Sequence, residues 1–219
     1  MPLSAYVQST IFLALAALAL FGSAGTLAIP QFWLYLAILA GMTVASLAIL
    51  DPDLIRERMR PGGRRPPLSL QLAGLVPVAH WTVAGLDCGR WHWSDTVPVS
   101  LQAIGFIAVV AGLALFFWAI SVNRFFSSVA RIQTDRGQHV VDVGPYALVR
   151  HPGYAAALLF IIGSGLALGS WLAAALLIVL SVPMLLRRAV HEDRMLQAEL
   201  AGYRDYADRV RWRLIPGFW

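Results

Sequence analysis

The sequence predicts an all-α fold: a polytopic membrane helix bundle of about six hydrophobic helices, the last two forming a short hairpin, followed by a cytoplasmic C-terminal helix. Three observations predict it. Hydrophobic residues make up 58% of the 219 residues and charged residues only 13%, far more apolar than a soluble core requires. The apolar residues form runs long enough to cross a bilayer as helices. All 17 basic residues are arginines, and they lie between these runs.

The first four hydrophobic helices are predicted from runs of about 20 apolar residues, the length that spans the hydrocarbon core. The first run is not preceded by any Lys or Arg, so we expect an uncleaved span rather than a secretory signal. The second run follows so closely that Pro30 must end one helix or begin the next. The four runs cover about residues 9–29, 31–50, 68–86 and 97–122.

A helical hairpin is predicted from two shorter apolar runs, about 153–168 and 171–186. Gly169 and Ser170 separate them and favour a turn between antiparallel helices. Each run is shorter than an ordinary span, so we expect the hairpin to cross at low tilt or only just to reach the far interface.

The arginines predict the sidedness of the chain, because cytoplasmic loops are enriched in basic residues. With six crossings, 16 of the 17 arginines fall on one side, and only Arg90 on the other. We therefore expect an integral protein of the bacterial inner membrane, with both termini and the loops 51–67 and 123–152 in the cytoplasm, and no nucleic-acid partner. Five arginines are interpreted as topology signals and lipid-headgroup contacts: Arg56, Arg58, Arg60, Arg64 and Arg65.

Two polar pieces of chain, 123–154 and 187–213, flank the predicted hairpin. A hairpin returns the chain to the side from which it started, so we expect the two pieces to meet. The side chains brought together would be Arg150, His151, Tyr154, Arg188, Glu192 and Asp193.

Each of these pieces has two interpretations. The first could surround a flat polar ligand, or His151 and Tyr154 could only cap the hairpin at the membrane interface, where such residues are common. In the second, Arg188 and Glu192 stand four apart and share one helix face, as in an ordinary solvated ion pair. Ionisable groups at the end of an apolar helix are, however, costly enough to be functional candidates.

The C-terminal stretch 196–219 alternates acidic, basic and aromatic residues and predicts an interfacial amphipathic helix followed by an Ile-Pro-Gly turn. Trp212, Phe218 and Trp219 would hold this tail against the membrane surface, where it could act as a lid.

Several function classes lack their motifs. Cys88 is the single cysteine, and His80, His92 and His139 form no spaced ligand set, so no metal site is expected. His80 lies within an apolar run and is interpreted as a hydrogen-bonded packing residue. No phosphate-binding glycine loop and no nucleophile elbow occur, and strands do not alternate with helices as in a soluble nucleotide-binding fold.

The stretches "GQHVVDVGPYALVRHPGY" and "RRAVHEDRML", with the closing "YRDYADRV" and Ile-Pro, resemble the isoprenylcysteine carboxyl methyltransferase and phospholipid methyltransferase superfamily of integral membrane enzymes. The resemblance covers about the last hundred residues. The length of the chain predicts a single integral membrane domain, 1–219. In this domain we expect 1–122 to form a four-span scaffold, and the resemblance implies that 123–219 forms the cofactor-binding and catalytic part.

The resemblance also implies the ligands and the roles of residues. Arg188 and Glu192 would be catalytic, with Arg188 facing the methyl acceptor. Asp193 stands where the family has a second Glu, and the loop before Gly144 is one residue shorter than in the eukaryotic members. S-adenosylmethionine would be held by Gln133, His139, Val140, Val141, Tyr146, His151, Pro152, Gly153, Tyr154 and Glu192.

The expected reaction is therefore methyl transfer from S-adenosylmethionine to a lipid-like acceptor, such as the carboxylate of an isoprenylcysteine-like compound, beside membrane lipids as partners. This reaction needs no metal; it needs an acceptor lone pair held in line with the methyl carbon. Three alternatives stay open: an NADPH-dependent membrane reductase of the sterol-reductase type, a methyltransferase for a small thiol or amine, and a scaffold without activity.

Overall fold

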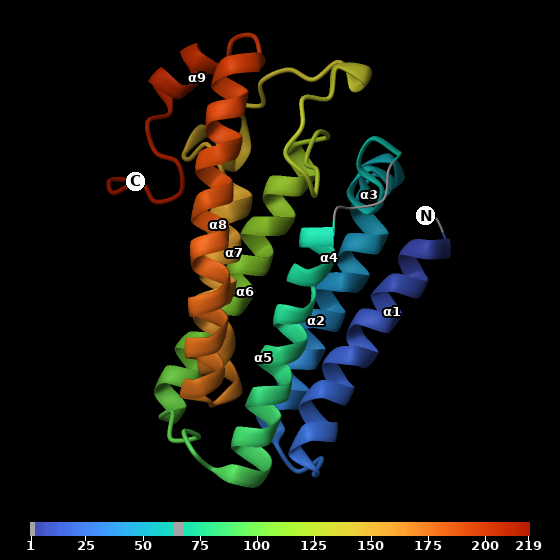
Figure 1. Cartoon of the computed structure of the whole chain (residues 1–219), viewed down its shortest axis with the longest axis vertical. Coiled ribbons are helices and arrows are strands. Elements are labelled where there is room, and N and C mark those ends of the chain that lie inside the picture. The colour runs from blue at the N-terminus through green and yellow to red at the C-terminus, as the bar shows by residue number, and fades with distance from the viewer. Residues whose placement is uncertain (1–2, 64–67) are drawn as a thin grey trace. The chain divides into compact units, whose positions relative to one another are not determined.

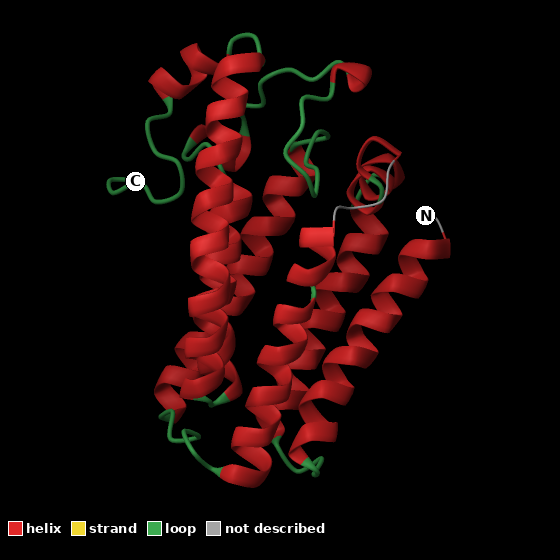
Figure 2. Cartoon of the chain, in the orientation of Figure 1, coloured by secondary structure: helices red, strands yellow, loops and turns green. Residues whose placement is uncertain are grey.

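The computed structural model describes residues 3–63 and 68–219, and all the regular structure in these ranges is helical, as predicted (Figures 1 and 2). Short 3-10 or π turns extend or connect the α-helices. The α-helices are α1 Leu3–Ala17, α2 Pro30–Ile49, α3 Pro52–Met59, α4 Leu68–Ala73, α5 Leu75–Leu86, α6 Val99–Val122, α7 Pro152–Leu168, α8 Trp171–Glu199 and α9 Tyr203–Arg209.

Four helical segments among the described residues are long and apolar enough to cross a membrane, which identifies an integral membrane protein. They are Leu3–Gly22, Pro30–Ile49, Val99–Val122 and Trp171–Glu199. Helix α7 is apolar but has only 17 residues, about 26 Å of helix, so it is as short as the sequence predicts. Its partner α8 continues for 29 residues, well past the apolar run.

Two predicted boundaries were wrong. The first apolar helical segment ends at Gly22 and not near 29, and the chain turns at Gly25, whose φ of 72° suits glycine. The run 68–86 consists of two helices, α4 and α5, that are separated at Gly74. Pro77 explains the break, because a proline ring would clash with the carbonyl of Ala73 in a continuous helix. Arg64 and Arg65 lie outside the described residues.

The chain divides into two compact units. The first contains α1, α2, α4, α5 and parts of α6–α8: Met1–Ile49, Pro67–Ala111 and Leu159–Val182. The second contains α3, α9, the segment between α6 and α7, and the remaining parts of α6–α8: Leu50–Pro66, Gly112–Leu158 and Pro183–Trp219.

A buried polar network connects four helices of the first unit. The Ser164 hydroxyl lies 2.7 Å from the Tyr35 hydroxyl and 2.8 Å from Nε2 of His80. Nδ1 of His80 lies 3.0 Å from the carbonyl oxygen of Ala173. Polar groups in an apolar interior must pair with each other. His80 is therefore hydrogen-bonded between helices, as its interpretation as a packing residue predicts.

Helices α7 and α8 approach each other closely near the turn that joins them. A Cβ atom on Gly165 of α7 would lie 2.2 Å from the Cα atom of Ala174 of α8, so only glycine permits this approach. Between the helices, Gly169 adopts a φ of 87° and Ser170 follows it. The turn predicted at Gly169 and Ser170 is confirmed.

The second unit holds every residue that the sequence marks for function. One of its hydrophobic clusters contains Leu50, Leu54 and Ile120, and joins α3 to α6. Another contains Leu196, Tyr203 and Tyr206, and joins α8 to α9. Burial of these side chains holds the polar segments around the end of α8 in fixed positions.

Candidate functional site

The segment before α7 is shaped by its glycines and prolines. Gly144 has a φ of 60°, and a 3-10 turn follows over Gly144–Ala147. Pro152 is the first residue of α7, a position in which its missing N–H costs nothing. Arg150 and His151 lie immediately before the helix, outside any regular structure, and both side chains are buried.

The carboxylate of Asp193 on α8 collects the polar groups of this segment. Asp193 is 0% exposed. Arg150 donates to it twice, from Nε to Oδ1 at 2.8 Å and from NH2 to Oδ2 at 3.1 Å, and Nε2 of His151 lies 3.1 Å from Oδ1. Such two-point contact is the strongest arginine–carboxylate geometry.

Three further donors complete what we call the Asp193 cluster. Nε2 of Gln197 donates to Asp193 at 2.9 Å, the Tyr203 hydroxyl at 3.1 Å and Nε of Arg213 at 3.0 Å. Burial would lower the pKa of Arg150, but the hydrogen bonds and charge of Asp193 outweigh it and raise that pKa. The guanidinium therefore stays charged. The cluster consists of Arg150, His151, Asp193, Gln197, Tyr203 and Arg213.

The C-terminal tail is fixed to the same segment by its main chain. The amide of Arg150 donates to the carbonyl of Trp212 and that of His151 to the carbonyl of Arg213, each at 2.9 Å. NH1 of Arg150 also donates to the carbonyls of Val210 and Arg211, both at 2.8 Å. Arg150 thus ties the tail to α8 and α7, a role that no pattern in the sequence indicates.

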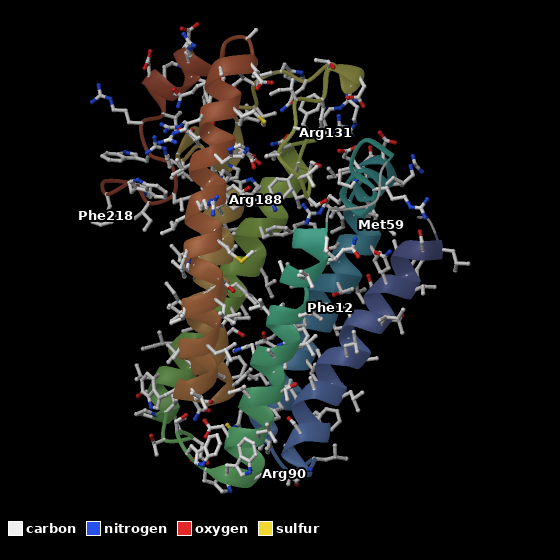
Figure 3. The ribbon with its side chains drawn as sticks, viewed as in Figure 1. Phe12, Met59, Arg90, Arg131, Arg188 and Phe218 are labelled. Carbon is white, nitrogen blue, oxygen red and sulfur yellow. The ribbon has the colours of Figure 1, made fainter. Side chains whose placement is uncertain are left out.

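A second group of side chains, which we call the Tyr154 cluster, contains Tyr154, Arg188 and Glu192 and is half-buried. The Tyr154 hydroxyl donates to Oε2 of Glu192 at 2.6 Å and accepts from Nε of Arg188 at 2.8 Å. NH2 of Arg188, on α8 (Figure 3), donates to the carbonyl of Ser128. The predicted meeting of the pieces 123–154 and 187–213 is confirmed by these bonds and by those of Asp193.

Tyr146 is buried and is hydrogen-bonded to the side chains of Asn123 and Tyr206. Its hydroxyl accepts from Nδ2 of Asn123 at 2.9 Å, and its carbonyl accepts from the Tyr206 hydroxyl at 2.7 Å. Burial raises the pKa of Tyr146, so its phenol is neutral at physiological pH. Tyr146 therefore positions α9 against the segment that precedes α7.

Gln133 is buried, and both ends of its amide are used within the protein. Its Nε2 donates to the carbonyl of Phe125 and its Oε1 accepts from NH1 of Arg136, each at 2.6 Å. His139 is exposed, and its ring packs edge-on against Phe125 with centroids 5.0 Å apart. In this arrangement Gln133 shapes the loop before the motif.

The main chain of 139–142, which includes Val140 and Val141, belongs to no helix or strand. Among the described residues, no hydrogen bond uses its amides or carbonyls. These backbone groups are available to a ligand.

Gly153 permits the close approach of an aromatic ring. A Cβ atom at this position would lie 2.5 Å from Cζ of Phe126. Phe126 in turn packs edge-on against Phe116 with centroids 5.4 Å apart, and the guanidinium carbon of Arg58 lies 5.0 Å from its ring centroid. Arg58 therefore reaches the candidate site, although its spacing in the sequence indicates only a topology signal.

Other contact residues were also missed from the sequence: Asn123, Phe126 and Ser128. They lie inside the polar piece 123–154, so their location was a weak signal, but no motif distinguishes them. Within 3–63 and 68–219, no group of three or more His, Cys, Asp or Glu side chains could hold a metal ion.

Comparison with protein families gives a match to the isoprenylcysteine carboxyl methyltransferase (ICMT) family over residues 103–198. The matched segment includes α7, the motif before it and all but the last residue of α8. No curated protein matches the chain.

Proposed function

From the match of residues 103–198 to a family of membrane methyltransferases, which confirms the resemblance that the motifs predict, we propose that the chain transfers a methyl group from S-adenosylmethionine to a lipid-like acceptor. The Tyr154 cluster is the observation that carries the proposal. It places a carboxylate, a phenol and a guanidinium side by side at the end of a short apolar hairpin. Here a polar donor and an apolar acceptor can both arrive.

The residues present fit the donor. Glu192 uses Oε2 for Tyr154, while no hydrogen bond among the described residues uses its Oε1, so the carboxylate can accept from an ammonium or a ribose hydroxyl. The main chain of 139–142, which is not hydrogen-bonded within the described residues, offers amides and carbonyls for a purine or ribose. We propose that Glu192, Tyr154 and this main chain hold the donor. Gln133, Arg150 and His151 would fix the positions of the loop and of the start of α7.

S-adenosylmethionine would supply a methyl carbon on a positively charged sulfur. The chain needs only to orient the acceptor and to exclude water, because fixed dipoles in a dry site replace the hydration that the reactants lose. Arg188 suits the orienting role, since a guanidinium binds a carboxylate or phosphate in a fixed plane. Its Nε bond to Tyr154 and its NH2 bond to Ser128 hold that plane.

The acceptor that we propose first is the carboxylate of an isoprenylcysteine-like compound. Arg188 presents a planar cation, and its guanidinium matches the two oxygens of a carboxylate. Mass spectrometry of membrane extracts, after incubation of the protein with isotopically labelled donor, will identify the product and so the accepting atom.

The test of the proposal is cofactor binding in detergent by isothermal titration calorimetry. We expect S-adenosylhomocysteine to bind and NADPH not to bind, because the family that residues 103–198 match is a family of methyltransferases. Glu192→Gln should weaken the binding by about tenfold, or 1.4 kcal/mol, since the ammonium loses its counter-charge. Glu199→Gln, at the exposed end of the same helix, is the control and should bind normally.

Binding of NADPH without S-adenosylhomocysteine would refute the methyltransferase and favour a membrane reductase. Equal losses in both glutamate variants would show that Glu192 does not contact the donor. Absence of binding of either nucleotide would favour a scaffold.

A further inference from the structure

Arg58 on α3 differs in its surroundings from Arg56, two residues earlier. NH2 of Arg56 lies 3.0 Å from Oδ1 of Asp53 on the exposed side of the helix. Arg58 instead is half-buried, and its guanidinium carbon lies 5.2 Å from the ring centroid of Phe116 and 5.0 Å from that of Phe126. A guanidinium over aromatic faces is attracted by the ring quadrupoles but is not neutralised.

The carboxylate next to Arg58 is already used. Glu57 accepts from Nε and NH2 of Arg131, both at 3.1 Å, and from the Ser127 hydroxyl at 3.1 Å. Among the described residues, no carboxylate pairs with the guanidinium of Arg58. Helix α3 thus brings to the site one negative charge that is neutralised and one positive charge that is not.

Ser128 connects Arg58 to Arg188. Its hydroxyl donates to the Arg58 carbonyl at 2.8 Å, and its own carbonyl accepts from NH2 of Arg188. Burial and the nearby charge of Arg188 lower the pKa of Arg58 to about 10. Two positive charges repel each other more strongly where they are partly shielded from water, as the guanidinium groups of Arg58 and Arg188 are. A bound anion would offset this repulsion.

We propose that Arg58 and Arg188 together form a binding site for the anionic head of an apolar-tailed molecule, a carboxylate or a phosphate, with Phe116 and Phe126 as its apolar wall. The inference rests on the proposed function for the identification of this molecule as the methyl acceptor. Arg58 lies outside residues 103–198, so this part of the site is contributed by a segment that the family match does not cover.

Binding of simple amphiphiles tests the site without knowledge of the natural acceptor. Decanoate, decyl phosphate and decanol are titrated into the full-length protein in a neutral detergent, with and without S-adenosylhomocysteine. We expect both anions to bind at least about tenfold more tightly than decanol, because a hydrogen bond between two charged groups is stronger than one to a neutral hydroxyl. The preference between the two anions distinguishes a carboxylate acceptor from a phosphate one.

Arg58→Gln should weaken the binding of the preferred anion by about tenfold or more and leave that of decanol unchanged. Arg58→Lys should retain part of the affinity, because it keeps the charge but loses the planar fork. Arg56→Gln is the matched control and should behave as the unsubstituted protein. Thermal unfolding and S-adenosylhomocysteine affinity, both unchanged in Arg58→Gln, show that the variant is folded.

Unchanged anion affinity in Arg58→Gln, or an equal loss of decanol binding, would overturn the inference. The anion titrations do not depend on the nucleotide. If S-adenosylhomocysteine fails to bind the unsubstituted protein, the proposed function fails, whereas the two-arginine site stands or falls on the amphiphiles alone.

Discussion

Glu192 and Asp193 are neighbours on α8, yet their carboxylates serve opposite purposes. Asp193 is fully buried and accepts from Arg150, His151 and three further side chains of the Asp193 cluster. Glu192 is half-buried and bonds through Oε2 to Tyr154 alone among the described residues. A carboxylate whose oxygens are all occupied holds the structure together, and one with an unused oxygen can bind a ligand.

The difference also shows how one helix end can be both rigid and open. Successive residues of an α-helix point about 100° apart, so one turns toward the tail and α9 while the other turns toward Tyr154. The Asp193 cluster fixes the backbone from which Tyr154 projects, since Arg150 and His151 immediately precede α7. Precise placement of the Tyr154 cluster therefore depends on the Asp193 cluster.

The largest effect should follow from Asp193→Ala. The change leaves Arg150 and Arg213 without their buried counter-charge, which typically costs about 3–5 kcal/mol. We expect thermal unfolding in detergent to shift down by at least about 6 °C. The exposed Asp208→Ala is the control. A shift no larger than that of the control would show that the Asp193 cluster is not what holds the tail.

A smaller and different effect is expected from Tyr154→Phe. Without the hydroxyl, Glu192 and Arg188 lose the atom through which they are held at 2.6 and 2.8 Å. We expect the dissociation constant of S-adenosylhomocysteine to rise by about tenfold, with thermal stability almost unchanged. The exposed Tyr6→Phe serves as the control. A large loss of stability would instead show that Tyr154 has a structural role like that of the Asp193 cluster, and that the two clusters do not differ in purpose.

The smallest effect is expected from Glu57. Its carboxylate is paired, as that of Asp193 is, but its partner Arg131 is partly exposed to solvent. Burial raises the pKa of Glu57, but hydrogen bonds from Arg131, Gly62 and Ser127 outweigh it and lower that pKa below its ordinary value of 4.5. A lowered pKa in the folded state means that the stabilisation is complete above pH 4.5 and is lost as the pH falls through the folded pKa.

In Glu57→Gln we therefore expect a flatter decline of the unfolding temperature at acidic pH, with Glu199→Gln declining as the unsubstituted protein does. An identical acid profile in all three proteins would indicate that Glu57 is paired no better in the folded state than in the unfolded state.

Much of the fold and part of the site were predictable from local features. The positions of the apolar helices follow from the length of hydrocarbon to be crossed, and the hairpin turn from Gly169 and Ser170. The meeting of the motif with the end of α8 follows from the chain itself, because a short turn leaves an antiparallel return as the compact arrangement. The family resemblance was visible in the sequence because the motifs that show it are short, contiguous stretches of residues.

What the sequence by itself determined was an apolar helical bundle whose polar pieces converge, since both depend on periodicity and chain connection. Only the tertiary structure decided which of two adjacent carboxylates is enclosed, and that Arg58 of α3 shares Ser128 with Arg188. These outcomes depend on how side chains far apart in the chain fill the space around one another. No local pattern encodes that packing, because each contact joins residues whose spacing in the sequence is arbitrary.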